Sequence, residues 1–313
     1  MRPLLLIGGL LVFICLQSCG DGLIKNQHAD TLEKMTDSNS KASTLSSRQD
    51  TNVNGEKKII GYWVGTFKPD TSMEGISTGE YTAWDFSNKI NISIDSLYED
   101  RVIGHSVVAG NARPFKGRFK KDGSLFEFDV REPGDDKYDG EFKFYIFKGD
   151  TILNGTWKAY QKIRVPARRY TLYKRFFKYD PSLRLSGIRY VDWTKKKSKY
   201  VKDDELGNYY DETFFSTTID VYKFNASSDL LTKEQVSNMK KADIFILRNS
   251  IYARHGYSFK NQQLRAFFDR QPWYIPVSTD VKKELTGIEK ANIELLLRFE
   301  QNAKEYYDEF GRG

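Results

Sequence analysis

The sequence predicts an α+β protein with two domains: an antiparallel β-barrel or meander, then a small all-helical C-terminal domain. From residue 59 to 177, short runs with a two-residue hydrophobic period follow one another without a helix-length segment between them. From about residue 230 the period becomes that of amphipathic helices. The length of 313 residues, with 39% hydrophobic and 14% aromatic residues, suffices for about two folded cores.

Residues 1–18 have the organisation of a signal peptide. Arg2 precedes an apolar run from Leu4 to Leu16, which is short for a bilayer-spanning helix. The run ends in LQSCG (16–20), which resembles a bacterial lipobox and would make Cys19 the acylated residue. Several acyl chains anchor a protein stably, whereas a single chain holds it weakly. The alternatives are an ordinary cleaved signal or an uncleaved helix with a chance cysteine.

The lipobox resemblance predicts a bacterial envelope protein, lipid-anchored to the outer membrane and either periplasmic or surface-exposed. Cys15 and Cys19 are the only cysteines, so cleavage before Cys19 leaves neither a disulfide nor a thiolate metal site. Residues 19–58 are almost entirely polar and predict a flexible tether. No cofactor is expected, and the sequence leaves open the ligand, the choice between inner and outer membrane, the side of the membrane and the oligomeric state.

The net charge of +7 and the pI near 9.0 are compatible with an anionic partner, although a solvated surface of mixed charge is the preferred interpretation. An extracytoplasmic address argues against nucleic acid and leaves envelope glycan, peptidoglycan, lipid headgroups or another protein. The excess of 49 basic over 42 acidic residues is mild, which favours the mixed-charge surface.

The first domain is predicted over residues 59–177. The turn signals KDGS (121–124) and KGDT (148–151) join neighbouring runs at hairpin spacing, and closure into a barrel would remove exposed edges. Eight runs are predicted as strands: IIGYWVGTF (59–67), KINISIDSL (89–97), RVIGHSVVAG (101–110), PFKGRFK (114–120), SLFEFDVRE (124–132), GEFKFYIFKG (140–149), TILNGTWKAY (151–160) and RRYTLYKRFF (168–177).

Two short motifs in this domain carry a further resemblance. The Gly-Tyr-Trp at 61–63 is similar to the Gly-x-Trp opening of lipocalin and avidin-type barrels, and the Gly-Thr-Trp at 155–157 resembles a closing strand. This resemblance implies an interior that could hold a small ligand. The alternative is an interior filled by aromatic side chains, which we expect for so small a barrel.

His105 is the single histidine of this domain and lies on one face of a predicted strand. A catalytic histidine needs a nucleophile or carboxylate partner, which the sequence does not indicate. The nearby Asp95, Glu99 and Asp100 are interpreted as a turn.

Residues 178–229 are predicted to be a semi-extended connector. The stretch WTKKKSKYVKDDELGNYYDE (193–212) carries a basic run and then an acidic run with aromatics between them, which is typical of a solvated loop or a polyanion-binding patch. FSTTIDVYKF (215–224) is predicted as one strand.

The C-terminal module opens with a capping box between Thr232 and Gln235. A second helix is predicted from near Asp243 to the turn before Gly256, which is placed for a left-handed C′ position. Its side chains divide into a core face and an adjacent polar stripe: Ile244, Leu247 and Ile251 on the first, Arg248, Tyr252 and His255 on the second.

Two further helices are predicted beyond Gly256. The first is short and ends before Pro272, after which Trp273 and Tyr274 form an extended aromatic clamp. The second begins with a capping box between Thr286 and Glu289. The inward-facing residues of the two helices are predicted to be Leu264, Phe267, Phe268, Ile288, Leu295, Leu296 and Phe299.

The segment ILRNSIYARHGYSFKNQQLRAFFDRQPWY (246–274), followed by LTGIEKANIELL (285–296), resembles a YARHG domain. The five naming residues are those from 252 to 256, and the domain is predicted over 230–303, before a tail of 304–313. The resemblance implies a bacterial extracellular domain without assigned activity, and it supplies no catalytic residues.

The conspicuous side chains of this module are assigned structural or candidate binding roles rather than chemistry. The neighbouring Asp243, Asp269 and Asp280 fall in no recognised catalytic spacing, and the histidines His28, His105 and His255 suggest no metal site. We expect the polar stripe to pack against Trp273, with a guanidinium on an aromatic ring. The residues concerned are Arg248, Tyr252, Arg254, His255, Gly256, Trp273 and Tyr274.

Three functions follow from these observations. The first is a non-catalytic envelope module that binds a glycan, peptidoglycan or a protein, with aromatics such as Trp193, Tyr209 and Trp273 exposed. The second is a small-ligand carrier, which needs an open apolar cavity of several hundred Å³ in the barrel. The third is a hydrolase, which needs paired carboxylates or a partnered histidine in a cleft.

Overall fold

The computed structural model describes residues 58–72 and 87–303. These residues belong to one of the two compact units of the chain, spanning 46–313. The predicted signal peptide, Cys19, most of the tether, His28 and the tail of 304–313 lie outside the described residues.

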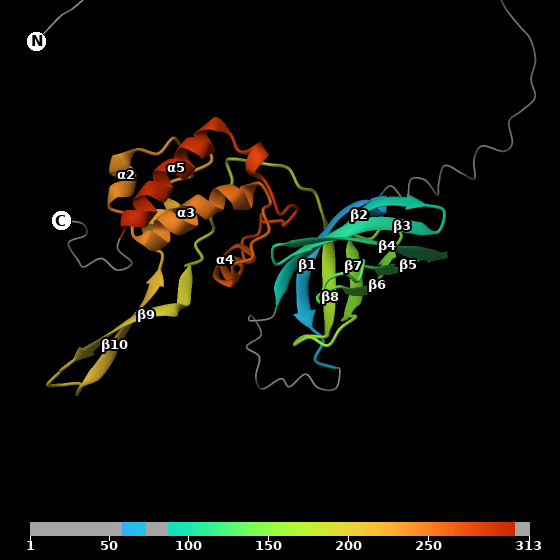
Figure 1. The fold of residues 1–313 in the computed structure, drawn as a ribbon, viewed down its shortest axis with the longest axis horizontal. Coiled ribbons are helices and arrows are strands. Elements are labelled where there is room, and N and C mark those ends of the chain that lie inside the picture. The colour runs from blue at the N-terminus through green and yellow to red at the C-terminus, as the bar shows by residue number, and fades with distance from the viewer. Residues whose placement is uncertain (1–57, 73–86, 304–313) are drawn as a thin grey trace, which may run out of the picture. The chain divides into compact units, whose positions relative to one another are not determined.

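The first domain is a closed antiparallel barrel in which each strand pairs with the next and β8 pairs with β1 (Figure 1). All eight predicted strands are confirmed. The prediction that Gly155–Trp157 belongs to the closing strand was wrong, because these residues lie in β7 and the barrel is closed by β8. The strands are β1 (Gly61–Pro69), β2 (Asn88–Tyr98), β3 (Arg101–Val108), β4 (Asn111–Asp122), β5 (Leu125–Arg131), β6 (Gly140–Phe147), β7 (Ile152–Ala159) and β8 (Ala167–Arg175).

Period-two alternation directs the phenylalanines into the barrel. In β5 the buried Phe126, Phe128 and Val130 alternate with exposed neighbours. The ring of Phe128 stacks on Phe144 at 4.7 Å and on Phe119 at 5.5 Å between centroids. Over this part of its length the barrel is filled by aromatic side chains, as expected for its size.

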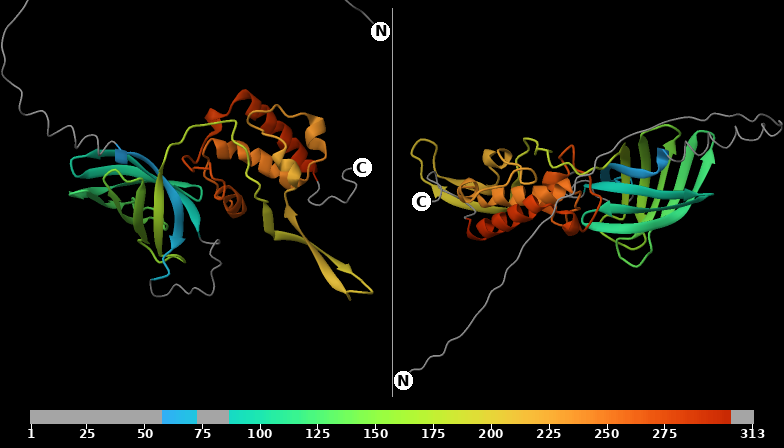
Figure 2. Two further views of the ribbon diagram at one scale, coloured as in Figure 1. Left: turned by 180° about the vertical axis from the view of Figure 1, so that it is seen from behind. Right: turned by 90° about the horizontal axis from the view of Figure 1, so that it is seen from above.

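Residues 178–229 differ from the predicted semi-extended connector. They contain a two-stranded hairpin of β9 (Val191–Val201) and β10 (Tyr209–Ser216), which extends beyond the helices (Figure 2). The predicted strand 215–224 was wrong, because β10 ends at Ser216 and Ile219–Tyr222 forms the 3₁₀ helix η1. The side chain of Thr218 accepts a hydrogen bond from the backbone N–H of Asp220, which favours a helical turn.

The C-terminal module is helical, as predicted, and α3 packs against α5. Both predicted capping boxes are present, at Thr232 and Thr286. The helix predicted from near Asp243 begins slightly earlier, at Lys241. The elements are α2 (Lys233–Ser237), α3 (Lys241–Arg254), α4 (Gln262–Phe268), η2 (Lys282–Glu284) and α5 (Gly287–Asn302).

The predicted core positions of this module are buried, with two exceptions. Phe299 is only half-buried against the core. Ile288 was wrongly predicted to face inward, since it is 41% exposed. Its neighbour Glu289 turns inward instead, and consecutive helical residues point about 100° apart.

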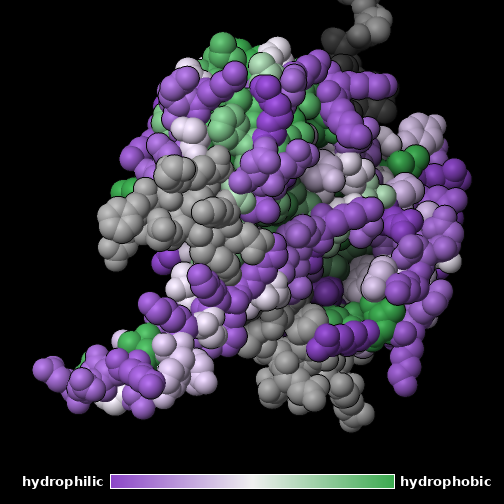
Figure 3. Space-filling model, turned by 60° about the vertical axis from the view of Figure 1, so that its left-hand side comes forward, coloured by the Kyte–Doolittle hydropathy of each residue, from purple (hydrophilic) through white to green (hydrophobic). Residues whose placement is uncertain are grey.

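The described residues include no helix that is long and apolar enough to cross a bilayer. Hydrophilic side chains cover much of the face in Figure 3, with smaller hydrophobic areas between them.

Candidate functional site: a pocket at one end of the barrel

A pocket of about 560 Å³ opens at the barrel end where the loops after β5 and β7 lie. Ends of several strands and both loops line it, and Arg265 of α4 contributes to its rim. A larger hollow of about 840 Å³ lies over β1, β7 and β8 and borders Ser72, where the described residues are interrupted. The described residues therefore define the first cavity more completely.

The floor of the pocket is aromatic. Phe67, Phe142 and Trp157 all line it, and each is at most 5% exposed. The Phe67 ring centroid lies 5.7 Å from that of Trp157, in an edge-to-face arrangement, and 6.3 Å from that of Phe142. Such a floor offers apolar contact area in a fixed geometry.

Glu132 is a buried carboxylic side chain in the wall of the pocket. Its Oε2 accepts hydrogen bonds from the backbone N–H of Gly140 at 2.8 Å and from the indole N–H of Trp157 at 3.2 Å. Its Oε1 accepts one from the hydroxyl of Ser106 at 3.1 Å. Burial raises the pKa of Glu132 to about 7, because these hydrogen bonds only partly replace hydration of the charge.

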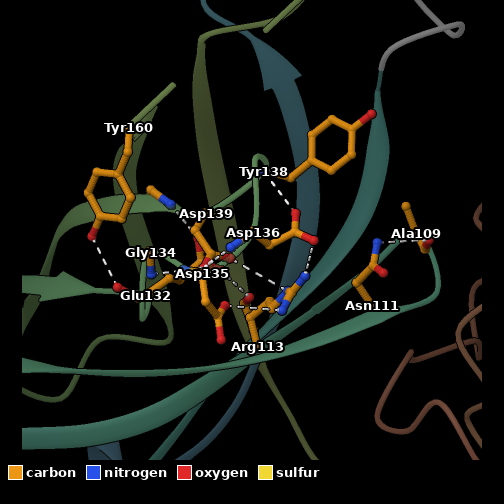
Figure 4. Close-up of polar contacts among 12 residues, drawn as sticks. Ala109, Asn111, Arg113, Glu132, Gly134, Asp135, Asp136, Tyr138, Asp139 and Tyr160 are labelled. Atoms are coloured by element: carbon orange, nitrogen blue, oxygen red, sulfur yellow. Dashed lines mark hydrogen bonds and ion pairs between the residues drawn. The ribbon is translucent and has the colours of Figure 1, made fainter. Parts of the chain in front are cut away.

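The loop between β5 and β6 is held by the buried carboxylate of Asp139 (Figure 4). Its Oδ2 accepts hydrogen bonds from the backbone N–H groups of Gly134, Asp135 and Asp136, at 2.9 to 3.3 Å. A carboxylate that bonds successive N–H groups fixes the path of a short loop. The loop thereby presents Lys137 and Tyr138 at the rim of the pocket.

Arg113 faces the three acidic side chains of this loop. Its guanidinium lies 2.6 Å from Asp136 and 3.7 Å from Asp135. Its Nε lies 3.5 Å from Oδ1 of Asp139, an ion pair without hydrogen-bond geometry. From the β7 side, the hydroxyl of Tyr160 donates to the backbone carbonyl of Glu132 at 3.2 Å.

Positive charge predominates around the pocket. Arg168 donates to the carbonyl of Phe67 at 3.0 Å and lies 4.9 Å above its ring. Burial lowers the pKa of Arg168 to about 10, so its guanidinium is still charged at neutral pH. Five cationic side chains line the pocket with one carboxyl, that of Glu132: Lys137, Lys162, Arg164, Arg168 and Arg265.

Sequence reasoning missed this site. The available signal was the basic run KIRVPARR (162–169) directly after Trp157. Glu132 gave no signal, because its importance comes from strands that are distant in sequence.

Arg254 lies in the interior of the C-terminal module and is 2% exposed. Its Nε donates to the carbonyl of Leu183 at 2.9 Å, and an amino group donates to the hydroxyl of Ser250 at 2.7 Å. Its guanidinium lies 5.8 Å from the ring centroid of Trp273, so the cation–π contact on Trp273 is made by Arg254 and not by the expected stripe residue Arg248. Burial lowers its pKa to about 10.

His255 is buried against other partners than those expected. Its Nε2 lies 2.8 Å from Oε2 of Glu289, and its ring stacks on Tyr179 at 4.1 Å. The expected packing of His255 on Trp273 is replaced by this contact. Burial acts to raise the pKa of Glu289, but hydrogen bonds from His255 and the backbone of Thr286 outweigh it and hold the pKa at about 2.

The other conspicuous residues of the module also have structural partners. Arg248 forms a bidentate ion pair with Glu300 of α5, at 2.8 and 3.2 Å, and not with the aromatic segment. The rings of Tyr252 and Tyr257 lie 6.1 Å apart. Gly256 follows α3 with φ of +73°, and an added Cβ would lie 2.4 Å from Val277.

The aromatic pair after α4 anchors two separate segments. The hydroxyl of the fully buried Tyr274 donates to the carbonyl of Tyr257 at 2.7 Å. The indole of the half-buried Trp273 donates to the carbonyl of Arg184 at 2.8 Å. Both side chains therefore contribute to folding.

His105 has a carboxylate partner that the sequence did not indicate. Its Nδ1 lies 2.7 Å from Asp95, across the β2–β3 pair. Both side chains are partly exposed, at 32% and 43%, and neither lines the barrel-end pocket. Among the described residues, no group of three His, Cys, Asp or Glu side chains could hold a metal ion.

The fold and the site define a two-domain α+β protein, in which a closed eight-stranded barrel with a pocket at one end precedes a helical module. The family model of the YARHG domain matches residues 219–301, so the chain carries this domain. The match begins earlier than the predicted start at 230 and includes η1. Comparisons with curated proteins and with solved structures found no match.

We predict that Glu132→Gln changes the pH dependence of stability. A carboxyl whose pKa rises from 4.5 to about 7 stabilises the fold fully below about pH 4.5, and this contribution is lost as the pH rises through 7. The wild type should therefore lose about 3 kcal/mol relative to the variant between pH 4.5 and pH 8. Urea denaturation at several pH values measures this difference, and parallel curves would contradict the raised pKa.

Glutamine suits this position because its oxygen can accept from Gly140 and Trp157 while its amide donates to Ser106. A general loss of stability, equal at every pH, would show instead that this geometry is not kept.

We predict that His255→Ala lowers the free energy of unfolding by about 3 kcal/mol, since it leaves the buried carboxylate of Glu289 without its partner. The matched control is His105→Ala, which breaks a histidine–carboxylate pair of similar length at a partly exposed site. That change should cost less than about 1 kcal/mol. Thermal and urea denaturation measure both values, and equal losses would refute a special role for burial.

Proposed function

We propose that the protein is a non-catalytic binding protein of the bacterial cell envelope, anchored by lipid at Cys19. In this proposal the barrel-end pocket is its ligand site. The observation that carries it is a cavity of about 560 Å³ with an aromatic floor and polar groups in its wall. Small-molecule sites have this size and composition, and an eight-stranded barrel is compatible with a binding role.

The pocket combines two of the functions considered from the sequence. It has the several hundred Å³ expected for a carrier, but it occupies only one end of the barrel because stacked phenylalanines fill the interior near Phe128. A ligand would therefore sit at the mouth, partly open to solvent. Such a site suits reversible capture more than complete enclosure.

Binding explains the conspicuous residues better than hydrolysis does. His255 and Glu289 are paired but are only 3% and 0% exposed, so substrate cannot reach them in this conformation. His105 and Asp95 are reachable, but they lie outside the pocket. A general acid–base pair needs both hydrogen-bond reach and a substrate site.

The address and the partners are part of the same proposal. The LQSCG motif and the bacterial extracellular character implied by the YARHG resemblance both support an outer-membrane anchor, on the periplasmic or the outer side. A glycan, peptidoglycan or protein partner is supported by exposed aromatics on the β9–β10 hairpin, where Trp193 is 59% exposed and Tyr209 is 44% exposed.

The anchor predicts that the wild-type chain incorporates labelled palmitate and sediments with outer membranes. Cys19→Ala should abolish labelling, because no other cysteine remains at the cleavage site. Metabolic labelling followed by membrane fractionation measures both properties. An unlabelled, membrane-free wild-type chain would overturn the proposed address.

The pocket predicts that the chain from residue 20 onward binds N-phenyl-1-naphthylamine, a neutral fluorophore in which a phenyl ring is joined to a naphthalene. Val108→Trp should weaken this binding at least about tenfold, because Val108 lines the pocket and the larger side chain would fill it. Tyr98→Trp, at an exposed position at the other end of β2, is the matched control and should leave binding unchanged. Equal binding by all three chains would overturn the pocket as ligand site, and so would wild-type failure to bind both this fluorophore and an anionic fluorophore with the same apolar body.

A further inference from the structure

We propose that the barrel-end pocket selects small organic anions, in which a single carboxylate, phosphate or sulfonate group is joined to a compact apolar body of one or two aromatic ring systems. The inference rests on the proposed binding function and names the chemical class of its ligand. It is argued from the distribution of charge around the pocket and from the form of its floor.

The charge around the cavity is strongly asymmetric. Five lysine and arginine side chains line it, against the single carboxyl of Glu132. Because a cleft with low-dielectric walls concentrates the field of its charges, such a lining attracts anions and repels cations. The overall charge of +7 is mild, so this local excess is a property of the site rather than of the whole surface.

The neighbouring acidic side chains lie outside the lining of the pocket, and one of them, Asp269, interacts with the charge of Arg265. Asp135, Asp136 and Asp139 all pair with the guanidinium of Arg113, and Asp139 is also bonded by backbone N–H groups of its own loop (Figure 4). None of these three aspartates lines the pocket. The loop therefore presents Lys137 to the cavity, while its three carboxylates lie outside the lining and face Arg113, whose single charge offsets one of them.

The cations differ in the roles open to them. Arg168 is held by the carbonyl and the ring of Phe67. It therefore contributes to the positive electrostatic potential of the pocket rather than moving to contact a ligand. Lys137 and Lys162 are exposed at the rim, where flexible ammonium groups can meet an anionic group at the mouth. An anion held there would leave the rest of the ligand directed towards the floor.

The floor sets the form of the apolar part. Phe67 and Phe142 are stacked, whereas Trp157 is edge-on to Phe67 and tilted to Phe142, with centroids 5.7 to 6.4 Å apart. This arrangement offers ring faces and edges to a flat group. The stacked Phe128 and Phe144 fill the barrel beyond, so a long acyl chain could not extend along the axis.

The test compares two fluorophores that share one apolar body. The first is 8-anilinonaphthalene-1-sulfonate, an anion, and the second is N-phenyl-1-naphthylamine, which lacks the sulfonate. We expect the anion to bind at least about tenfold more tightly to the chain from residue 20 onward, and this advantage to shrink as salt is added.

Charge variants locate the effect. Lys162→Glu combined with Lys137→Glu should weaken binding of the anion at least about tenfold and change binding of the neutral fluorophore less than about twofold. Lys148→Glu combined with Lys120→Glu, away from the pocket, makes the same change in net charge and should have little effect. Glu132→Gln should strengthen binding of the anion, because it removes the single carboxyl of the lining.

The outcomes separate the two proposals. If neither fluorophore binds, both the ligand site and its class are overturned. If both bind equally, or if the distant lysine pair matters as much as the rim pair, the pocket remains a ligand site and its selectivity for anions is overturned. Circular dichroism and thermal denaturation of each variant confirm that the fold is retained.

Discussion

The buried carboxyl of Glu132 joins four strands at the end of the barrel where the pocket opens. It extends from the chain just after β5 and accepts hydrogen bonds from Ser106 of β3, Gly140 of β6 and Trp157 of β7. These donors position both the indole of the floor and the start of the next strand. The form of the pocket therefore depends on one ionisable group, whose own charge is disfavoured by burial.

The YARHG domain uses a buried carboxylate in a comparable way, but with a different balance of charge. Glu289 caps the start of α5 and at the same time accepts hydrogen bonds from His255 and from the hydroxyl of Tyr179. It thus joins α3, α5 and the segment that follows the barrel. Where Glu132 has only neutral donors, Glu289 has a histidine, and this difference explains why the two pKa values move in opposite directions.

The sequence predicted what depends on local pattern. Alternation marked all eight barrel strands, and the residues Thr232 and Thr286 marked two helix starts through capping boxes. It failed where a distant partner decides. The mixed charges of 193–212 suggested a loop, yet β9 and β10 pair with one another as a hairpin. The pocket is assembled from strand ends up to about a hundred residues apart in sequence. Neither the strand pairing nor the assembly of the pocket has a local sequence signature.

The residues that identify the YARHG family act mainly in folding. Arg254 and His255 are buried and fully engaged, and Gly256 occupies a backbone conformation and a space that favour glycine. A signature made of such residues identifies a scaffold and leaves its ligand unspecified. Any chemical selectivity of this chain is then expected outside the signature. The barrel pocket, which is lined by five cationic side chains and one carboxyl, is the place for it among the described residues. On this argument, proteins that share the YARHG domain need not share the ligand of this barrel.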